Sequence, residues 1–123
     1  MRDLTKAEEQ IMQVLWIIQP AFVKDIIAEL PEPKPAYSTV STIVRILESK
    51  GFIDHEAFGP THRYFAIISK DEYSHFSMKK MLENYFDGSL KQMVSFISKK
   101  EKLTLPEMDE LLNALEDLKK ENP

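Results

Sequence analysis

The sequence predicts a mainly α-helical protein with one β-hairpin, and two observations indicate this class. Apolar residues recur at intervals of three and four over most of the 123 residues, as expected for amphipathic helices. Over residues 52–58 and 62–68 that spacing gives way to aromatic and β-branched residues, with a Gly-Pro-Thr turn at 59–61. This second pattern is typical of a hairpin.

Three helices are expected before the hairpin. Thr5 and Glu8 form a capping-box pattern at the start of the first helix, and Pro20 prevents that helix from continuing. A short second helix is expected to end at the proline-rich stretch 31–35, which forms a stiff connector. The third helix is expected to end at Gly51, which is placed for a left-handed cap. This order of three helices and a hairpin is typical of a winged helix-turn-helix domain.

Three further helices are expected after the hairpin, each with a capping pattern at its start. The pairs are Ser69 with Glu72, Ser89 with Gln92, and Thr104 with Glu107. We therefore divide the chain into a winged-helix DNA-binding domain over residues 1–69 and a three-helix dimerisation domain over residues 70–123.

The second domain is predicted to form a homodimer. A helical unit of about 55 residues usually needs a partner to bury its apolar faces. The predicted dimerisation residues are Leu90, Met93, Val94 and Ile97 in one helix and Met108, Leu111, Leu112 and Leu115 in the next.

Composition and charge exclude several classes of protein. The formal charge is 16 − 20 = −4, so the chain is not a globally basic nucleic-acid binder, and any such activity needs a local surface. No apolar run approaches the roughly 20 residues that a membrane span requires, and no apolar signal segment is expected at the start. Membrane insertion is therefore not expected. The absence of cysteine excludes disulfides and thiolate chemistry and fits a cytoplasmic protein.

Neither catalysis nor metal binding is predicted. The sequence has no glycine-rich phosphate loop and no Ser/His/Asp arrangement, so we expect no catalytic residue and no cofactor. His55, His62 and His75 lack the spacing of metal ligands. The acidic pairs at 8–9 and 109–110 are interpreted as solvated helix faces, and Trp16 as a core residue.

The outward face of the third helix is the predicted contact with double-stranded DNA. Hydroxyl groups bond to base edges or phosphates, an arginine takes a guanine edge or a phosphate, and a recognition helix reads bases mainly from its first residues. The predicted DNA-binding residues on this face are Ser38, Thr39, Ser41, Thr42 and Arg45, with Lys34, Lys50, His62 and Arg63 around them. Alternatively, the serines and threonines only cap the helix, and the spacing leaves both interpretations open.

Two segments resemble the penicillinase repressor (BlaI/MecI) family. They are residues 4–16, which run from Leu-Thr-Lys-Ala to Val-Leu-Trp, and residues 39–55, from Thr-Val-Ser-Thr to Phe-Ile-Asp-His. The resemblance extends over nearly the whole chain. It implies a transcriptional repressor that binds inverted-repeat operators as a homodimer. It also implies that a membrane sensor with a metalloprotease domain ends repression by triggering cleavage in the C-terminal domain.

Copper-responsive relatives carry cysteine pairs near the C-terminus, which this chain lacks, so the resemblance does not extend to that branch. Two departures from the family pattern limit the transfer. Penicillinase-type members have basic residues at the positions of Ser38 and Ser41, so the operator sequence does not transfer. In penicillinase-type members the cleaved bond joins an asparagine to a phenylalanine, whereas the residues at the corresponding position of this chain are Ser95 and Phe96. We predict this bond as the cleavage site.

Two other functions remain as alternatives. The acidic net charge is compatible with a winged helix that binds proteins instead of DNA. A ligand-responsive one-component regulator is the second alternative, because pockets between helices cannot be recognised in one sequence.

Overall fold

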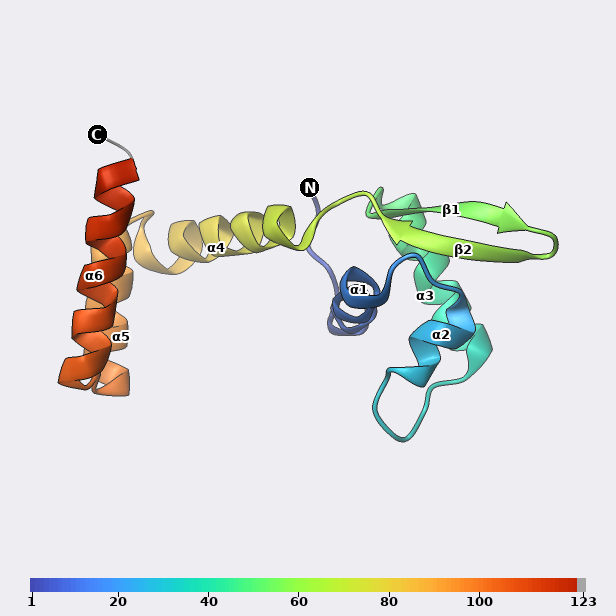
Figure 1. Cartoon of the computed structure of the whole chain (residues 1–123), viewed down its shortest axis with the longest axis horizontal. Helices are drawn as coiled ribbons and strands as arrows, with labels where there is room; N and C mark the ends of the chain where they lie inside the picture. Colours follow the sequence, from blue (N-terminus) through green and yellow to red (C-terminus); the bar gives the residue numbers. More distant parts are fainter. Residues whose placement is uncertain (122–123) are drawn as a thin grey trace. The chain divides into compact units, whose positions relative to one another are not determined.

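The computed structural model describes the backbone of residues 1–121 and the side chains of these residues except 115, 118, 119 and 121. Its elements, in chain order, are α1 (Lys6–Ile18), α2 (Val23–Ala28), α3 (Tyr37–Ser49), β1 (Ile53–Phe58), β2 (Thr61–Ala66), α4 (Lys70–Phe86), α5 (Leu90–Glu101) and α6 (Leu105–Glu121) (Figure 1). The predicted class is confirmed: a winged helix-turn-helix is followed by further helices. The chain forms two compact units, residues 1–78 and residues from 79 onward, so α4 contributes to both.

The N-terminal unit is built around one apolar core. α1, α2 and α3 each turn one face inward, and the first residues of the hairpin close the core. Its most deeply buried side chains are Met12, Leu15, Ile26, Val40, Val44, Leu47, Phe52 and Ile53. Burial of this size drives folding of the unit, since apolar surface removed from water contributes about 25 cal/mol per Å². The core also fixes which face of α3 remains exposed.

Local capping signals act as the sequence predicted. The Thr5 hydroxyl accepts a hydrogen bond from the Glu8 amide at 3.2 Å, and the Glu8 carboxylate accepts one from the Thr5 amide at 2.8 Å. Ser69 and Glu72 form the same reciprocal pair before α4. Gly51 has φ of +82°, a left-handed conformation that glycine adopts without a steric penalty.

The interpretation of Glu8 as part of a solvated helix face is wrong. Its side chain is buried and accepts a hydrogen bond from Lys50 Nζ at 2.7 Å, in addition to its capping bond. A helical pattern shows that position 8 lies near the boundary of the apolar stripe, but the ammonium group that pairs with it comes from 42 residues further along the chain.

The hairpin is slightly shifted relative to its prediction. β1 pairs with β2 in antiparallel register from Ile53 opposite Ala66 to Phe58 opposite Thr61. Phe52 does not join β1, because its amide bonds to the Leu47 carbonyl and its own carbonyl accepts from the amides after β2. The hairpin tip extends beyond the three helices (Figure 1). It is the wing of the fold.

The wing is anchored to the helices by an additional bridge. Ala21, between α1 and α2, exchanges two backbone hydrogen bonds with Tyr64 of β2, at 2.9 and 2.7 Å. Tyr64 and Ala21 are both buried. The base of the wing is thereby held in a fixed position against the core.

The first turns of α4 belong to the N-terminal unit. Tyr73 is buried, its hydroxyl accepts from the Leu4 amide at 2.9 Å, and its ring lies 5.6 Å from the ring of Phe52. Trp16 also packs here, with its indole N–H donating to the Ile68 carbonyl at 2.9 Å. Trp16 is therefore a structural residue, as predicted.

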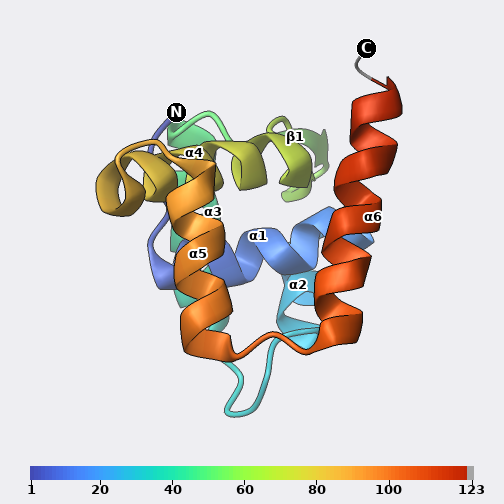
Figure 2. The same ribbon diagram turned by 90° about the vertical axis from the view of Figure 1, so that its left-hand side faces the viewer.

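The C-terminal unit has little core of its own. α5 and α6 run in opposite directions and are joined by residues 102–104 (Figure 2). Leu82 is the only apolar side chain that is buried among the described residues of this unit. Within the part of the chain that the structure describes, no helix combines the length and apolar character needed to cross a membrane.

Candidate DNA-binding surface

The exposed face of α3 carries the predicted polar residues. Val40, Val44 and Leu47 point into the core, so the opposite side of the helix faces solvent. Ser38, Thr39, Thr42 and Arg45 are exposed, and Ser41 is half-buried. The hydroxyl groups concentrate in the N-terminal half of the helix, which is the part that reads base edges in recognition helices.

The structure weighs against capping as the role of these hydroxyl groups. The N-cap of α3 is Ala36, whose side chain cannot accept a hydrogen bond. The Thr42 hydroxyl donates to the Ser38 carbonyl at 2.9 Å, a bond within the helix that leaves the oxygen as an acceptor. Within the described residues, the hydroxyls of Ser38 and Thr39 have no hydrogen-bond partner. Their full bonding capacity is available to a ligand.

An open groove separates α3 from the tip of the wing. Tyr37, Ser41 and Arg45 line it from α3, and Pro60, Thr61 and His62 line it from the hairpin. Arg45 Nη2 donates to the Ser41 hydroxyl at 3.2 Å, which holds the guanidinium group along the helix. Tyr37 is 57% exposed and was not among the predicted residues. Its position directly before the hydroxyl-rich segment of α3 could have identified it from the sequence.

Arg63 is held on the surface of the wing. Its Nη2 lies 3.3 Å from Glu56 Oε2, and its guanidinium carbon lies 4.5 Å from the centre of the Phe58 ring. The ion pair is largely solvated, with 35% and 59% of the two side chains exposed, so it stabilises the hairpin by less than about 1 kcal/mol. Because the pair is exposed to solvent, the guanidinium group can exchange Glu56 for another anion, such as a phosphate.

The two predicted lysines form bonds inside the N-terminal unit. Lys34 Nζ donates to the carbonyls of Ala28 and Leu30, at 2.8 and 2.7 Å, and so satisfies the C-terminal end of α2. The ammonium group of Lys50 is bonded to Glu8, and only 16% of the Lys50 side chain is exposed. Counting charges along the sequence could not reveal that either ammonium group is bonded within this unit. In the free protein both lysines stabilise the positions of helices.

The ion pair with Lys50 affects the pKa of Glu8. Burial raises the pKa of Glu8, but hydrogen bonds from Lys50 and Thr5 and the charge of Lys50 outweigh this effect. The net pKa of Glu8 is therefore lowered from its ordinary value of 4.5. The charged form of Glu8 is the one that the fold stabilises.

The two wing histidines lie against each other. The rings of His55 and His62 are stacked with their centres 4.0 Å apart and their planes within 6°. His62 is exposed at the groove, whereas His55 is half-buried between the wing and α3. Burial raises the pKa of Tyr64, which packs beside both rings, and the negative charge of Glu48 raises it further.

The predicted dimerisation residues lie on surfaces that the single chain leaves open. Leu90 and Leu112 are 59% and 56% exposed, and Val94, Ile97, Met108 and Leu111 are each between 37% and 39% exposed. Met93 is half-buried. The side chain of Leu115 lies outside the described residues. Several of these side chains line a groove between α5 and α6, including Met93, Val94, Ile97 and Leu111.

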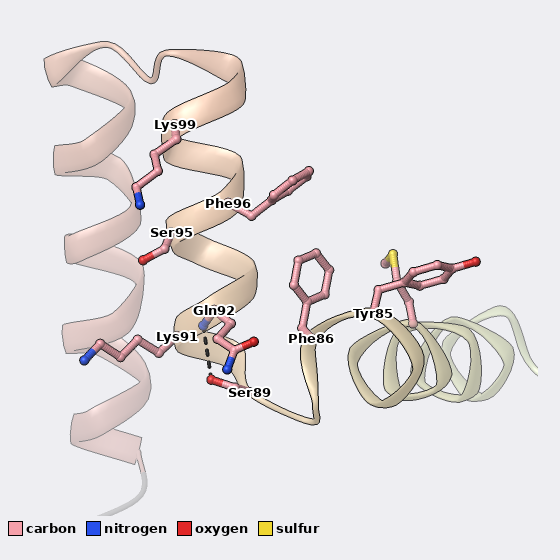
Figure 3. Close-up of a pocket in the computed structure, with 9 residues that line it drawn as sticks. Tyr85, Phe86, Ser89, Lys91, Gln92, Ser95, Phe96 and Lys99 are labelled. Atoms are coloured by element: carbon pink, nitrogen blue, oxygen red, sulfur yellow. Dashed lines mark hydrogen bonds between the residues drawn. The ribbon is translucent and has the colours of Figure 1, made fainter.

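The predicted cleavage site lies in the middle of α5. Figure 3 shows Phe96 pointing away from α5 toward Phe86, with the two ring centres 5.6 Å apart. The same hollow is lined by Tyr85 and Gln92. Phe96 is 51% exposed, and none of the described α5 side chains is buried. This segment is therefore weakly held by its own chain.

The three helices, the hairpin and the polar face of α3 define a winged helix-turn-helix protein. The model of the penicillinase repressor family matches residues 4–117. The chain belongs to the penicillinase repressor family, a family of transcriptional repressors.

Named relatives match almost from end to end. The methicillin resistance regulatory protein MecI of Staphylococcus aureus (strain N315) is 25% identical over 114 residues, which cover 92% of this chain and 93% of the relative. The penicillinase repressor of Bacillus licheniformis is 26% identical over 118 residues, or 95% and 92% of the two chains. The penicillinase repressor of Staphylococcus aureus is 24% identical over 119 residues, or 96% and 94%. By name, these relatives are a regulatory protein and two repressors.

Proposed function

We propose that the chain is a transcriptional repressor that binds inverted-repeat operators in double-stranded DNA as a homodimer. The observation that carries this proposal is the exposed first half of α3, which lies on the same unit as the wing. Its Ser38 and Thr39 hydroxyls have no hydrogen-bond partner among the residues that the structure describes. A two-fold dimer presents two such helices, and its operator must then share that symmetry. The operator DNA is the proposed partner.

The exposed apolar residues of α5 and α6 support the homodimer. Exposed apolar side chains that gather along two neighbouring helices mark an interaction site in soluble proteins. A second copy of the chain offers the same stripes in return, as a two-fold interface requires. Residues 71–123 carry 8 basic and 11 acidic groups, so most of the excess negative charge belongs to the part of the sequence that follows the proposed DNA-binding residues.

The salt dependence of binding tests the DNA proposal. The purified chain is used to select fragments from its native genome, and the affinity for a selected fragment is measured over a range of salt concentrations. The logarithm of the binding constant should fall with a slope of about −0.9 per phosphate neutralised. If no fragment binds at low salt, the winged helix acts as a protein-interaction module. If a small molecule is required for binding, the chain is a ligand-responsive regulator.

Thr39 and Arg63 should contribute to DNA binding in different ways. Thr39→Val keeps the shape of the side chain but removes its hydroxyl, so we expect a loss of about 1–3 kcal/mol of discrimination at one base pair. Arg63→Ala removes a phosphate contact, so it should weaken all sequences alike and reduce the salt slope by about one phosphate. A panel of operators with single base changes measures both effects. Equal behaviour of the two variants across the panel would contradict this division of roles.

We further propose that repression ends by proteolysis at Ser95-Phe96 within a membrane sensor and protease pathway. Cleavage there separates Leu90, Met93 and Val94 from Ile97 and from all of α6. One cut therefore divides the proposed dimer stripe of α5 and separates its first three residues from the stripe of α6. A bond inside a helix reaches a protease only after local opening, and a segment with few buried contacts opens at low cost. The exposure of α5 meets this condition.

Mass spectrometry of the chain from induced cells tests the cleavage. We expect the 14.3 kDa chain to be replaced by two fragments divided after Ser95. The Phe96→Ala variant should stay intact and keep its genes repressed, whereas Phe86→Ala, which leaves the scissile bond unchanged, should still be cut. Intact wild-type chain in fully derepressed cells would rule out the cleavage mechanism.

A further inference from the structure

We propose that Glu48, Asp54 and His55 form a binding site for a divalent transition-metal ion of the zinc class. The three residues come from two elements: Glu48 from the last turn of α3, and Asp54 and His55 from the start of β1. One donor atom of each residue lies within 4.8 Å of the other two. The site therefore joins the end of α3 to the base of the wing.

The geometry of the donor atoms converges on one point. His55 Nδ1 is hydrogen-bonded to Glu48 Oε1 and lies 3.9 Å from Asp54 Oδ1. Consecutive residues of a strand point to opposite faces, but Asp54 Oδ1 also accepts from the His55 amide at 2.8 Å, which turns its carboxylate back toward the imidazole. Around a tetrahedral zinc ion with bonds of about 2.0–2.2 Å, ligand atoms lie roughly 3.3–3.6 Å apart. Small rotations of the side chains reach that arrangement.

The chemistry of the donor set selects the class of ion. An imidazole nitrogen favours zinc and similar transition metals over magnesium and calcium, which take oxygen ligands. Carboxylate oxygens complete a mixed nitrogen and oxygen set that zinc accepts. Three protein ligands leave one position for water, as in open zinc sites. The ring of His62 stacked on His55 holds the imidazole plane in place.

Charge and access also favour a cation. Two carboxylates share this small region, and among the described residues neither forms a salt bridge with a lysine or arginine. The side chains of Glu48, Asp54 and His55 are 32%, 58% and 29% exposed, which leaves a path from solvent. Binding places the ion between Nδ1 and Glu48, where the hydrogen bond now lies, and releases any proton held there.

Titration of the full chain with zinc chloride by calorimetry at pH 7 tests the site. The wild-type chain should bind one Zn²⁺ tightly enough to resolve by calorimetry. His55→Gln removes the imidazole ligand, and Glu48→Gln replaces an anionic carboxylate with a neutral amide that binds zinc weakly. Each should therefore weaken binding by at least about tenfold. His75→Gln, on the exposed side of α4, is the matched control and should bind as the wild type does.

A second measurement separates loss of the site from loss of the fold. Zinc should raise the melting temperature of the wild-type chain and of His75→Gln, but not that of His55→Gln, whose metal-free melting curve should remain cooperative. Absence of binding by the wild-type chain, or equal binding by His55→Gln, would overturn the proposal. DNA takes no part in either measurement, so the proposed repressor function is tested separately.

Discussion

The Leu112→Asp variant should sediment as a monomer and bind a complete operator about 10²–10⁴ times more weakly than the wild-type chain. Leu112 is 56% exposed on α6 and lies beside Leu111 in the proposed interface. A carboxylate there must be buried without a partner if the dimer forms, which costs more than the interface can supply. Two half-sites that are linked through a dimer bind at high effective concentration, and that gain is lost in the monomer. Sedimentation and fluorescence anisotropy measure the two effects.

The matched control is Asn113→Asp, which adds the same charge one residue further along α6. Asp109, Asn113 and Glu116 recur at helical spacing and form the polar face of that helix. This variant should remain dimeric. Leu112→Asp should still bind a single half-site with unchanged affinity, because residues 1–78 form a unit with its own core. A dimeric Leu112→Asp variant would show that the interface lies elsewhere.

Much of the fold could be predicted because its signals are local. The capping pairs Thr5 with Glu8 and Ser69 with Glu72 act over three residues, and the structure contains both. Gly51 ends α3 because its conformation has a positive φ. The spacing of Val40, Val44 and Leu47 alone fixed the buried face of α3 and therefore its exposed face.

Side-chain partners from distant segments could not be predicted in the same way. The charge of Lys34 and Lys50 predicts a role in DNA binding and gives no sign that their ammonium groups bond to α2 and to Glu8 in the folded chain. The meeting of Glu48 and His55 depends on how the chain turns after α3. No periodicity encodes these contacts. They follow from the packing of the core, which the sequence determines but which no local sequence pattern reveals.

The Lys50→Met variant should unfold with a free energy about 3 kcal/mol lower than that of the wild-type chain at neutral pH. Met keeps most of the volume of the lysine stem but leaves the buried Glu8 carboxylate without its cation. Removing one partner of a buried ion pair typically costs about 3–5 kcal/mol, and the lower end applies here because 16% of the Lys50 side chain remains exposed. Urea unfolding followed by Trp16 fluorescence measures the change.

The Glu8→Gln change separates the ion pair from the helix cap, because glutamine also completes a capping box. The double variant Glu8→Gln with Lys50→Met should therefore recover much of the stability that Lys50→Met loses.

The dependence of the unfolding free energy on pH provides an independent check. Since the pKa of Glu8 is lower in the folded chain than its ordinary 4.5, its contribution is complete above that pH and disappears as the pH falls through the folded value. The wild-type chain should lose this stability in acid, and Glu8→Gln should not. Identical acid unfolding of the two proteins would show that the pair of Glu8 and Lys50 contributes nothing to the fold.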